Sequence, residues 1–198
     1  MINIVLASAS PRRSEILEKL NIPFQKRVSL IDEAKYFNDD PRELVKTLSL
    51  EKAKSVIIEA NEDKIIIGAD TVVVYDNKVL GKPHNDQDAL CYLKQLSGKM
   101  HFVYTGITML HPLYNKVYID YCETMVFMRD YNEHEMNAYI KTKEPIDKAG
   151  AYAIQGYGAT LVDKIDGDYY NVVGLPISKL IEGFFHLGVD YFNSFHND

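Results

Sequence analysis

The chain lacks several features that would narrow its function at once. Its 198 residues contain no tryptophan and only two cysteines, Cys91 and Cys122. Two cysteines so far apart form neither a disulfide framework nor a metal-binding spacing, which fits a reducing compartment. The six histidines are scattered, and none pairs at a helical spacing that binds zinc. No apolar run is long enough to span a bilayer, so we expect no membrane partner.

Positive charge is also scarce. The chain has 22 lysines and arginines against 28 aspartates and glutamates, a net charge of −6. Proteins that bind nucleic-acid polymers are normally basic, so we expect no such partner, although a local basic pocket for a small anion remains compatible. No charged leader precedes the first apolar segment, and we expect a cytosolic protein. The length fits a single domain over residues 1–198.

Small residues and two arginines follow the first predicted strand. Residues 3–7 form a short apolar strand, and the sequence Ser8-Ala9-Ser10-Pro11-Arg12-Arg13 comes directly after it. Ser10 is a suitable N-cap and Pro11 a suitable first helical residue, for a helix through Leu20. Backbone amides at a helix start and adjacent guanidinium groups attract phosphates, so this segment predicts a polyphosphate cradle. An ordinary strand-to-helix turn with two solvated arginines is the alternative.

Apolar periodicity, caps and turn residues predict the other elements. We expect helices over residues 41–60, 86–97, 133–142 and 176–186, and strands over 24–30, 64–75, 79–80, 101–110, 116–128 and 160–165. The segment 144–176 is rich in glycine and polar residues. Long ordered loops of this kind usually carry function.

Two charged residues interrupt apolar patterns. Lys52 lies four residues from both Leu48 and Val56, and therefore shares their helix face. It must either extend to water or meet an anion, in which case it is a phosphate ligand. Asp70 lies within a nearly continuous apolar run, just after Gly68, where burial needs a paired cation. The alternative for Asp70 is a turn cap. Lys82, between Gly81 and Pro83, is either a ligand or a solvated loop lysine.

Six motifs occur in a fixed order along most of the chain. They are SASPRR (8–13), GADT (68–71), GKP (81–83), DKAGAY (147–152), IQG (154–156) and DYYNVVGLP (168–176). Any one is weak, but the ordered set resembles the Maf family of nucleoside triphosphate pyrophosphatases. The resemblance implies an α/β fold related to inosine triphosphate pyrophosphatases. In such a fold a mixed, elongated sheet is flanked by helices, and two lobes surround a nucleotide cleft.

The resemblance also implies a reaction and a cofactor. A nucleoside triphosphate is cut between its α and β phosphorus atoms, which gives the monophosphate and pyrophosphate, with Mg²⁺ or Mn²⁺. We expect Asp70 to act as general base or to hold the metal with its attacking water, and Glu33 to be the second metal carboxylate. Lys52 and the cations and hydroxyls of the motifs are expected to bind substrate; those of the motifs are Ser8, Ser10, Arg12, Arg13, Lys82 and Lys148.

Single positions indicate the sub-type. Members that resemble dTTP/UTP pyrophosphatases carry Arg, Thr and Gln at the positions of Arg12, Thr71 and Gln155, as this chain does. The branch that acts on 7-methyl-GTP tends to have Gln in place of Thr71 and Glu in place of Gln155. A glutamine amide offers a donor and an acceptor, as does the edge of uracil or thymine. We therefore expect dTTP, UTP or a modified pyrimidine nucleotide as substrate.

Two other functions are compatible with the sequence. A nucleotidyltransferase also begins with a strand, small residues and an arginine, but its loop is richer in glycine than residues 7–10, and it needs an acceptor where a pyrophosphatase needs only water. The Maf family is also associated with inhibition of septum formation, which suggests a non-enzymatic role through a partner. The resemblance further implies a homodimer.

Overall fold

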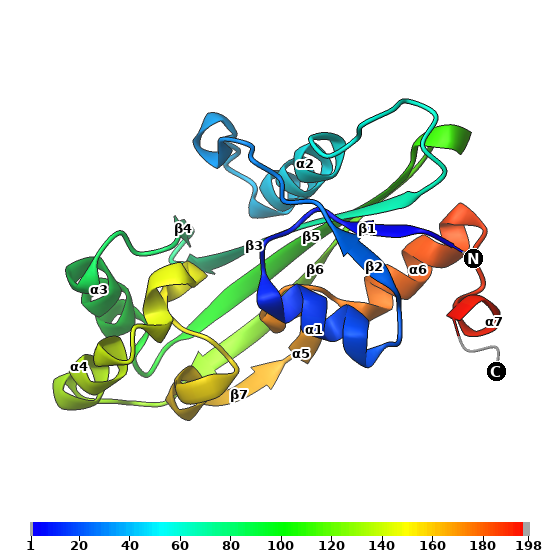
Figure 1. Cartoon of the computed structure of the whole chain (residues 1–198). Coiled ribbons are helices and arrows are strands. Elements are labelled where there is room, and N and C mark those ends of the chain that lie inside the picture. Colours follow the sequence, from blue (N-terminus) through cyan, green and yellow to red (C-terminus); the bar gives the residue numbers. More distant parts are fainter. Residues whose placement is uncertain (1, 196–198) are drawn as a thin grey trace. The chain divides into compact units, whose positions relative to one another are not determined.

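Seven strands and seven α-helices lie along residues 2–195, the part of the chain that this computed structural model describes (Figure 1). The strands are β1 (Ile4–Leu6), β2 (Phe24–Lys26), β3 (Ile65–Tyr75), β4 (Lys78–Leu80), β5 (Met100–His111), β6 (Lys116–Met128) and β7 (Val162–Asp166). The α-helices are α1 (Pro11–Lys19), α2 (Pro41–Lys54), α3 (Asp86–Leu96), α4 (Glu133–Lys141), α5 (Tyr169–Val173), α6 (Ile177–Leu187) and α7 (Tyr191–Phe195). Short 3₁₀ helices are η1 (Glu33–Lys35), η2 (Pro112–Tyr114), η3 (Glu144–Asp147), η4 (Ala149–Ala151) and η5 (Gly156–Leu161).

The strands form a mixed sheet. Hydrogen-bonded neighbours follow the order β2-β1-β3-β5-β6-β7, and β4 pairs with β3. Strand β1 runs parallel to both β2 and β3, whereas the β3–β4 and β6–β7 pairs are antiparallel. Strands β1 and β3 are buried and almost wholly apolar, as expected where helices cover the strands, whereas β2 at the edge of the sheet is polar and partly exposed. The predicted α/β class with a mixed sheet and flanking helices is confirmed.

Contacts divide the chain into two compact units. Unit 1 contains Met1–Asp70, Thr105–Cys122 and Gly174–Asp198, and unit 2 contains Thr71–Tyr104 and Glu123–Val173. Strand β3 passes from unit 1 into unit 2 between Asp70 and Thr71. The assignment of residues 1–198 to a single domain stays a prediction.

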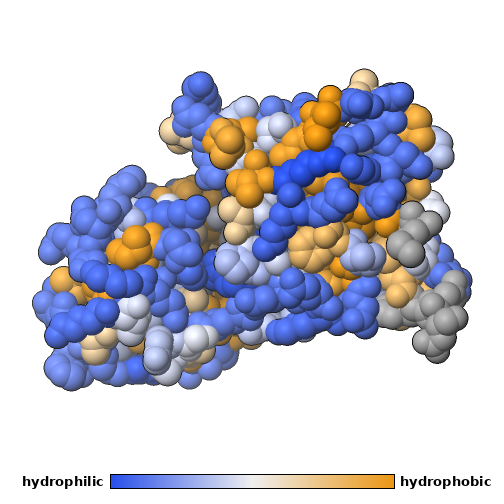
Figure 2. Space-filling view, viewed as in Figure 1, coloured by the Kyte–Doolittle hydropathy of each residue, from blue (hydrophilic) through white to orange (hydrophobic). Residues whose placement is uncertain are grey.

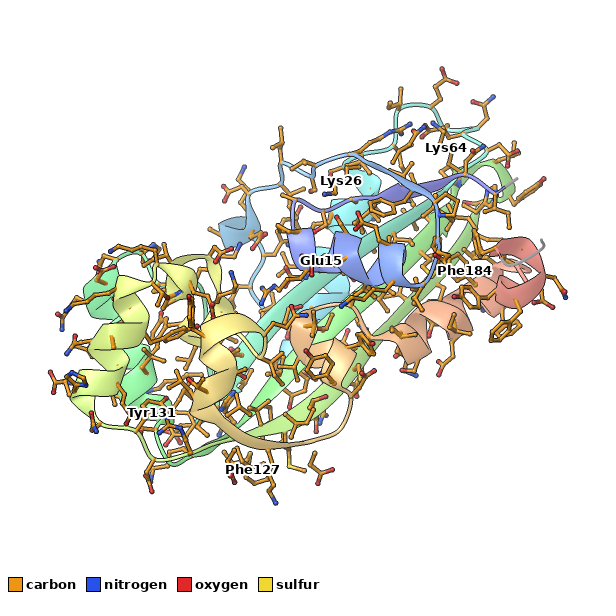
Figure 3. The ribbon with its side chains drawn as sticks, turned by 60° about the horizontal axis from the view of Figure 1, so that its bottom comes forward. Glu15, Lys26, Lys64, Phe127, Tyr131 and Phe184 are labelled. Atoms are coloured by element: carbon orange, nitrogen blue, oxygen red, sulfur yellow. The ribbon has the colours of Figure 1, made fainter. Side chains whose placement is uncertain are left out.

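In unit 1, helix α2 packs very closely on two strands. A Cβ atom at Gly68 of β3 would lie 2.2 Å from the carbonyl oxygen of Ser49, and one at Gly106 of β5 would lie 2.2 Å from that of Val45. Of the two features that a glycine before Asp70 indicates, a bulge or a close backbone approach, the structure has the close approach at Gly68. Helices α1 and α6 lie on the other side of these strands from α2 (Figures 1 and 3). Fully buried Phe184 of α6 stacks its ring on Tyr191 of α7.

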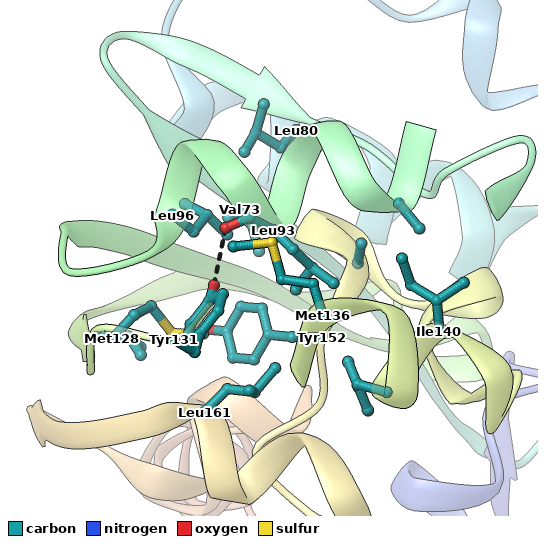
Figure 4. Packing of buried hydrophobic residues seen from close by; sticks show 14 of the residues in the cluster. Val73, Leu80, Leu93, Leu96, Met128, Tyr131, Met136, Ile140, Tyr152 and Leu161 are labelled. Atoms are coloured by element: carbon teal, nitrogen blue, oxygen red, sulfur yellow. Dashed lines mark hydrogen bonds between the residues drawn. The ribbon is translucent and has the colours of Figure 1, made fainter. Parts of the chain in front are cut away.

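Unit 2 has its own apolar core. Its buried side chains come from α3, α4, strands β3 to β6 and the 3₁₀ segments, and Tyr131 and Tyr152 lie among them (Figure 4). The hydroxyl of Tyr131 donates a hydrogen bond to the carbonyl of Leu93 at 2.9 Å. The Tyr152 hydroxyl lies 2.7 Å from Nε2 of buried His101. Both phenols thus bury their rings without leaving the hydroxyl unpaired.

Most predicted helix starts are confirmed by their caps. The Asp40 carboxylate accepts the Arg42 amide at 2.9 Å, and the Asn85 side chain accepts the Asp88 amide at 2.9 Å. Asn132 and Glu135 form a complete capping box at α4. Ser10 takes the N-cap position of α1, but its side chain makes no capping bond.

Several boundaries differ from the expected ones. Helix α2 ends at Lys54 instead of about residue 60, and β2 covers Phe24–Lys26 instead of residues 24–30. Helices α5 and α7 were not expected. The segment 144–176 contains three 3₁₀ helices before β7 and α5, and its positive φ values include those of Gly150 (67°) and Gly156 (67°).

Apolar side chains reach the surface as separate patches among hydrophilic residues (Figure 2). In unit 1 the most exposed are Leu30 and Phe37 between β2 and α2, and Ile58 just after α2. Of the helices within residues 2–195, none combines the length and apolar character that a membrane crossing requires.

Candidate active site

Three charged side chains of unit 1 meet at Lys52. Its ammonium lies 2.5 Å from Oδ1 of Asp70 and 2.7 Å from Oε1 of Glu33. The side chains of Asp70 and Lys52 are only 7% and 12% exposed, whereas that of Glu33 is 48% exposed. The structure thus brings together both predicted carboxylates and a predicted cation, and the charge in the apolar pattern of α2 meets anions instead of extending to water.

Local interactions hold Glu33 in this position. Glu33 begins η1, in the loop between β2 and α2. That loop is tied to α2 by a hydrogen bond of 2.8 Å between the hydroxyls of Ser29 and Ser55, and by one of 3.4 Å from Tyr36 to Glu51. Glu33 therefore reaches Lys52 from a segment anchored on the helix that carries Lys52.

Arg13 organises the loop between β1 and α1. Its Nε donates to the carbonyl of Gly174 at 2.7 Å, and its Nη1 donates to Oγ of Ser8 at 3.1 Å. The same Ser8 oxygen accepts the backbone N–H of Ser10 at 3.2 Å. Burial lowers the pKa of Arg13 from its usual value, and the negative charges of Asp70 and Glu33 oppose that shift. Arg13 therefore lies within the electrostatic reach of both carboxylates.

Ser10 and Arg12 lie at the start of α1. Ser10 accepts a hydrogen bond at its carbonyl from the Ser14 amide at 3.4 Å, and Pro11 occupies the first turn. The positive charge of Arg12 lowers the pKa of neighbouring Arg13 further. The predicted arrangement of a helix start beside two guanidinium groups is present in unit 1.

The remaining predicted site residues belong to unit 2. Thr71 follows Asp70 directly on β3. Lys82 is exposed in the segment after β4, and Lys148 directly follows η3 and forms an ion pair with neighbouring Asp147. The Gly150 amide donates to the Gly81 carbonyl at 3.1 Å, so the backbones that carry Lys82 and Lys148 are joined.

Glu144 holds the loop that carries Gln155, a role that the sequence pattern did not reveal. Its Oε1 accepts the Gly158 amide at 2.8 Å and the Tyr139 hydroxyl at 2.9 Å, and its Oε2 accepts the Tyr157 amide at 3.0 Å. A Cβ atom at Gly156 would lie 2.5 Å from Oε2, so glycine is required there. One carboxylate thus accepts the backbone amides two and three residues after Gln155.

The donor set of unit 1 fits a hard divalent cation. Glu33 and Asp70 present carboxylate oxygens, which Mg²⁺ and Mn²⁺ prefer, on either side of one cationic group. Within residues 2–195, no cluster of three or more His, Cys, Asp or Glu side chains could hold a metal. Mg²⁺ commonly uses one or two carboxylates, substrate phosphates and several waters, so two carboxylates are sufficient.

Comparisons with known proteins place the chain in a family. A HAM1 protein from Coxiella burnetii matches 98% of this chain and 96% of its own, at 13% identity and a TM-score of 0.42, which is too low to support an argument. A dTTP/UTP pyrophosphatase of Clostridioides difficile (strain 630) is 52% identical over 178 residues, 90% of this chain and 91% of that protein. A dTTP/UTP pyrophosphatase of Bacillus cereus (strain AH187) is 45% identical over 190 residues, 96% of this chain and 98% of that protein. The pattern of the Maf family (Maf-like protein) matches residues 3–186, and this chain therefore belongs to the Maf family.

Proposed function

We propose that this protein hydrolyses dTTP and UTP to the nucleoside monophosphate and pyrophosphate. The observation that carries the proposal is the buried Asp70 carboxylate, which lies 2.5 Å from Lys52 and shares that cation with Glu33. Buried carboxylates next to fixed cations are suited to the activation of water and the transfer of phosphoryl groups. The relatives named as dTTP/UTP pyrophosphatases support the same choice of substrate.

In this reaction a water oxygen forms a bond to the α-phosphorus while the bond to the oxygen that bridges to the β-phosphorus breaks. Asp70 takes the proton of the attacking water, and pyrophosphate leaves with the bridging oxygen. A divalent cation held by Glu33 and Asp70 would neutralise phosphate charge and polarise the reacting phosphoryl group. Catalysis then depends chiefly on positioning and charge stabilisation.

Cations of the chain are proposed to balance the charge on the phosphates. In unit 1 these are Arg12, Arg13 and Lys52, with the hydroxyls of Ser8 and Ser10 and the amides at the start of α1. Arg13 donates hydrogen bonds to Gly174 and Ser8, so it both contributes positive charge and fixes the loop between β1 and α1. In unit 2 the proposed phosphate ligands are Lys82 and Lys148.

Gln155 and Thr71 are proposed to select the base. An amide that both donates and accepts matches the donor and acceptor edge of uracil and thymine. Selectivity of this kind depends on a fixed amide, because a misplaced donor leaves a buried polar group unpaired. The carboxylate of Glu144, which accepts the amides of Tyr157 and Gly158, is therefore a positioning group for Gln155.

Glu144→Gln is expected to raise KM for dTTP about tenfold with little change in kcat, since a glutamine NH₂ would face backbone N–H donors and loosen the loop. Steady-state kinetics with dTTP measures this split. Glu133→Gln is the matched control, because Glu133 is 61% exposed and contacts Lys94 on the surface. An unchanged KM in the Glu144 variant, with the loop intact by hydrogen exchange, would contradict the positioning role.

The proposed activity is tested with a panel of dTTP, UTP, 7-methyl-GTP and ATP in Mg²⁺ and ¹⁸O-labelled water. We expect one pyrophosphate per monophosphate from dTTP and UTP, with the label in the monophosphate, and much slower turnover of the two purine nucleotides. No acceptor is needed, unlike in a nucleotidyltransferase. Release of orthophosphate, label in pyrophosphate, or a preference for 7-methyl-GTP would overturn the proposal.

The metal requirement is part of this proposal, and the homodimer and the cytosolic setting stay predictions. The metal requirement is supported by the oxygen ligands of Glu33 and Asp70. The homodimer rests on the family resemblance alone.

A further inference from the structure

The ammonium of Lys52 lies where two carboxylates converge. Its Nζ contacts one oxygen of Asp70 at 2.5 Å and one oxygen of Glu33 at 2.7 Å. One positive charge therefore contacts two carboxylates, one on the nearly buried Asp70 and the other on the half-exposed Glu33. Two carboxylates placed in this way would also hold a divalent ion such as Mg²⁺, which commonly uses one or two carboxylates.

The packing of helix α2 on strand β3 determines which residue Lys52 contacts. Leu48 of the same helix face is buried, as is Val56 just beyond the end of α2. Helix α2 approaches β3 so closely that a Cβ atom at Gly68 would lie 2.9 Å from the backbone nitrogen of Ala53, the residue after Lys52. Gly68 is two residues before Asp70 on β3. The close contact between α2 and β3 at Gly68 therefore also places Lys52 next to Asp70.

We propose that Lys52 and a divalent metal compete for the same pair of carboxylates. The ammonium holds Glu33 and Asp70 together in the metal-free protein, and metal binding displaces it. Two cations between the same carboxylates would repel each other at short range. The proposal rests on the proposed function in one respect, namely that Glu33 and Asp70 receive the metal.

The change in metal affinity on removal of Lys52 has opposite signs if Lys52 competes with the metal and if it only positions the carboxylates. If Lys52 only positioned the carboxylates, its removal would weaken metal binding. If it competes, its removal takes away a cation that occupies both carboxylates while Arg13 is unchanged, and a metal ion then binds more tightly. The sign of the change in affinity therefore separates the two roles, without any measurement of catalysis.

The test measures Mn²⁺ binding to the full-length protein without nucleotide, by the electron paramagnetic resonance signal of free Mn²⁺. Lys52→Met is expected to bind Mn²⁺ about tenfold more tightly than the wild type, equivalent to about 1.4 kcal/mol. Lys54→Met is the matched control, because Lys54 is on the same helix, is 52% exposed and pairs with Glu51 at 3.0 Å. It is expected to bind Mn²⁺ as the wild type does.

The double variant with Lys52→Met and Asp70→Asn tests whether the ion binds at Asp70. It is expected to bind Mn²⁺ less tightly than Lys52→Met does, without the tenfold increase in affinity. Because Lys52→Met removes the ammonium that contacts both carboxylates, Lys52→Gln is measured beside it, and circular dichroism checks that each variant is folded. Equal or weaker Mn²⁺ binding in a folded Lys52 variant would overturn the proposal, as would a gain that survives in the double variant. Hydrolysis of dTTP by the wild type is measured separately. A failure of the proposed competition between Lys52 and the metal can therefore be distinguished from a failure of the proposed function.

Discussion

Asp70→Asn is expected to lower kcat/KM for dTTP by roughly a hundredfold or more, about 3 kcal/mol of transition-state stabilisation. The amide keeps the shape of the side chain but takes no proton from water and binds a metal poorly. The measurement is pyrophosphate release from dTTP at saturating Mg²⁺. Because Lys52 retains its contact of 2.7 Å with Glu33, the fold is expected to persist.

Asp86→Asn is a matched control for this change. Asp86 is 54% exposed and pairs with Lys143 at 2.7 Å on the surface of unit 2, where an ion pair contributes about 0–1 kcal/mol. Its variant is expected to match the wild type in rate. Pyrophosphate release by a folded Asp70→Asn protein within a few-fold of the wild type would remove Asp70 from the chemistry, and with it the proposed general base.

The elements that the sequence predicted well are those with local causes. The caps at Asp40, Asn85 and Asn132 act within three residues of the helices that they start. The turn at residues 76–77 adopts positive φ values of 50° and 58°, which the short polar pair Asp76 and Asn77 tolerates between β3 and β4. Strand β3 is almost entirely apolar, so its burial was evident as well.

Boundaries set by distant residues could not be predicted. Helix α2 stops at Lys54 although apolar residues continue to Ile58. Beyond it, the carbonyl of Val56 accepts Nη1 of Arg27 at 3.2 Å, and Arg27 also pairs with Glu62 at 2.7 Å. These contacts join three separate segments, and no periodicity reveals them.

The same distinction applies to the candidate site. Asp70 and Lys52 stood out because each interrupts an apolar pattern, but the pattern did not show that they contact each other across 18 residues. Glu33 came from the family resemblance alone, since it lies in a polar loop. Glu144 was missed because its partners are backbone amides 13 and 14 residues later. Nearly every residue has such an amide, so the residue types in a sequence do not reveal these partners.

Gly68→Ala is expected to destabilise the protein by about 3 kcal/mol and to reduce dTTP hydrolysis more than tenfold. The added methyl group would lie 2.2 Å from the Ser49 carbonyl and 2.9 Å from Cβ of Ala53. Both contacts belong to the backbone or first side-chain atom of a helix, so α2 itself must move, and overpacking of this kind costs about 1–3 kcal/mol or more. Chemical denaturation gives the stability change.

The catalytic loss has a separate cause from the stability loss. A shift of α2 away from β3 moves Lys52 relative to Asp70, so activity measured well below the melting temperature is expected to fall even when the variant is fully folded. Gly81→Ala is the matched control, because a Cβ atom there meets nothing within 4 Å, and its stability is expected within about 0.5 kcal/mol of the wild type. If Gly68→Ala is as stable as Gly81→Ala, the close packing of α2 on β3 does not set the position of Lys52. If it is destabilised but fully active when folded, the distance between Lys52 and Asp70 is not what the reaction requires.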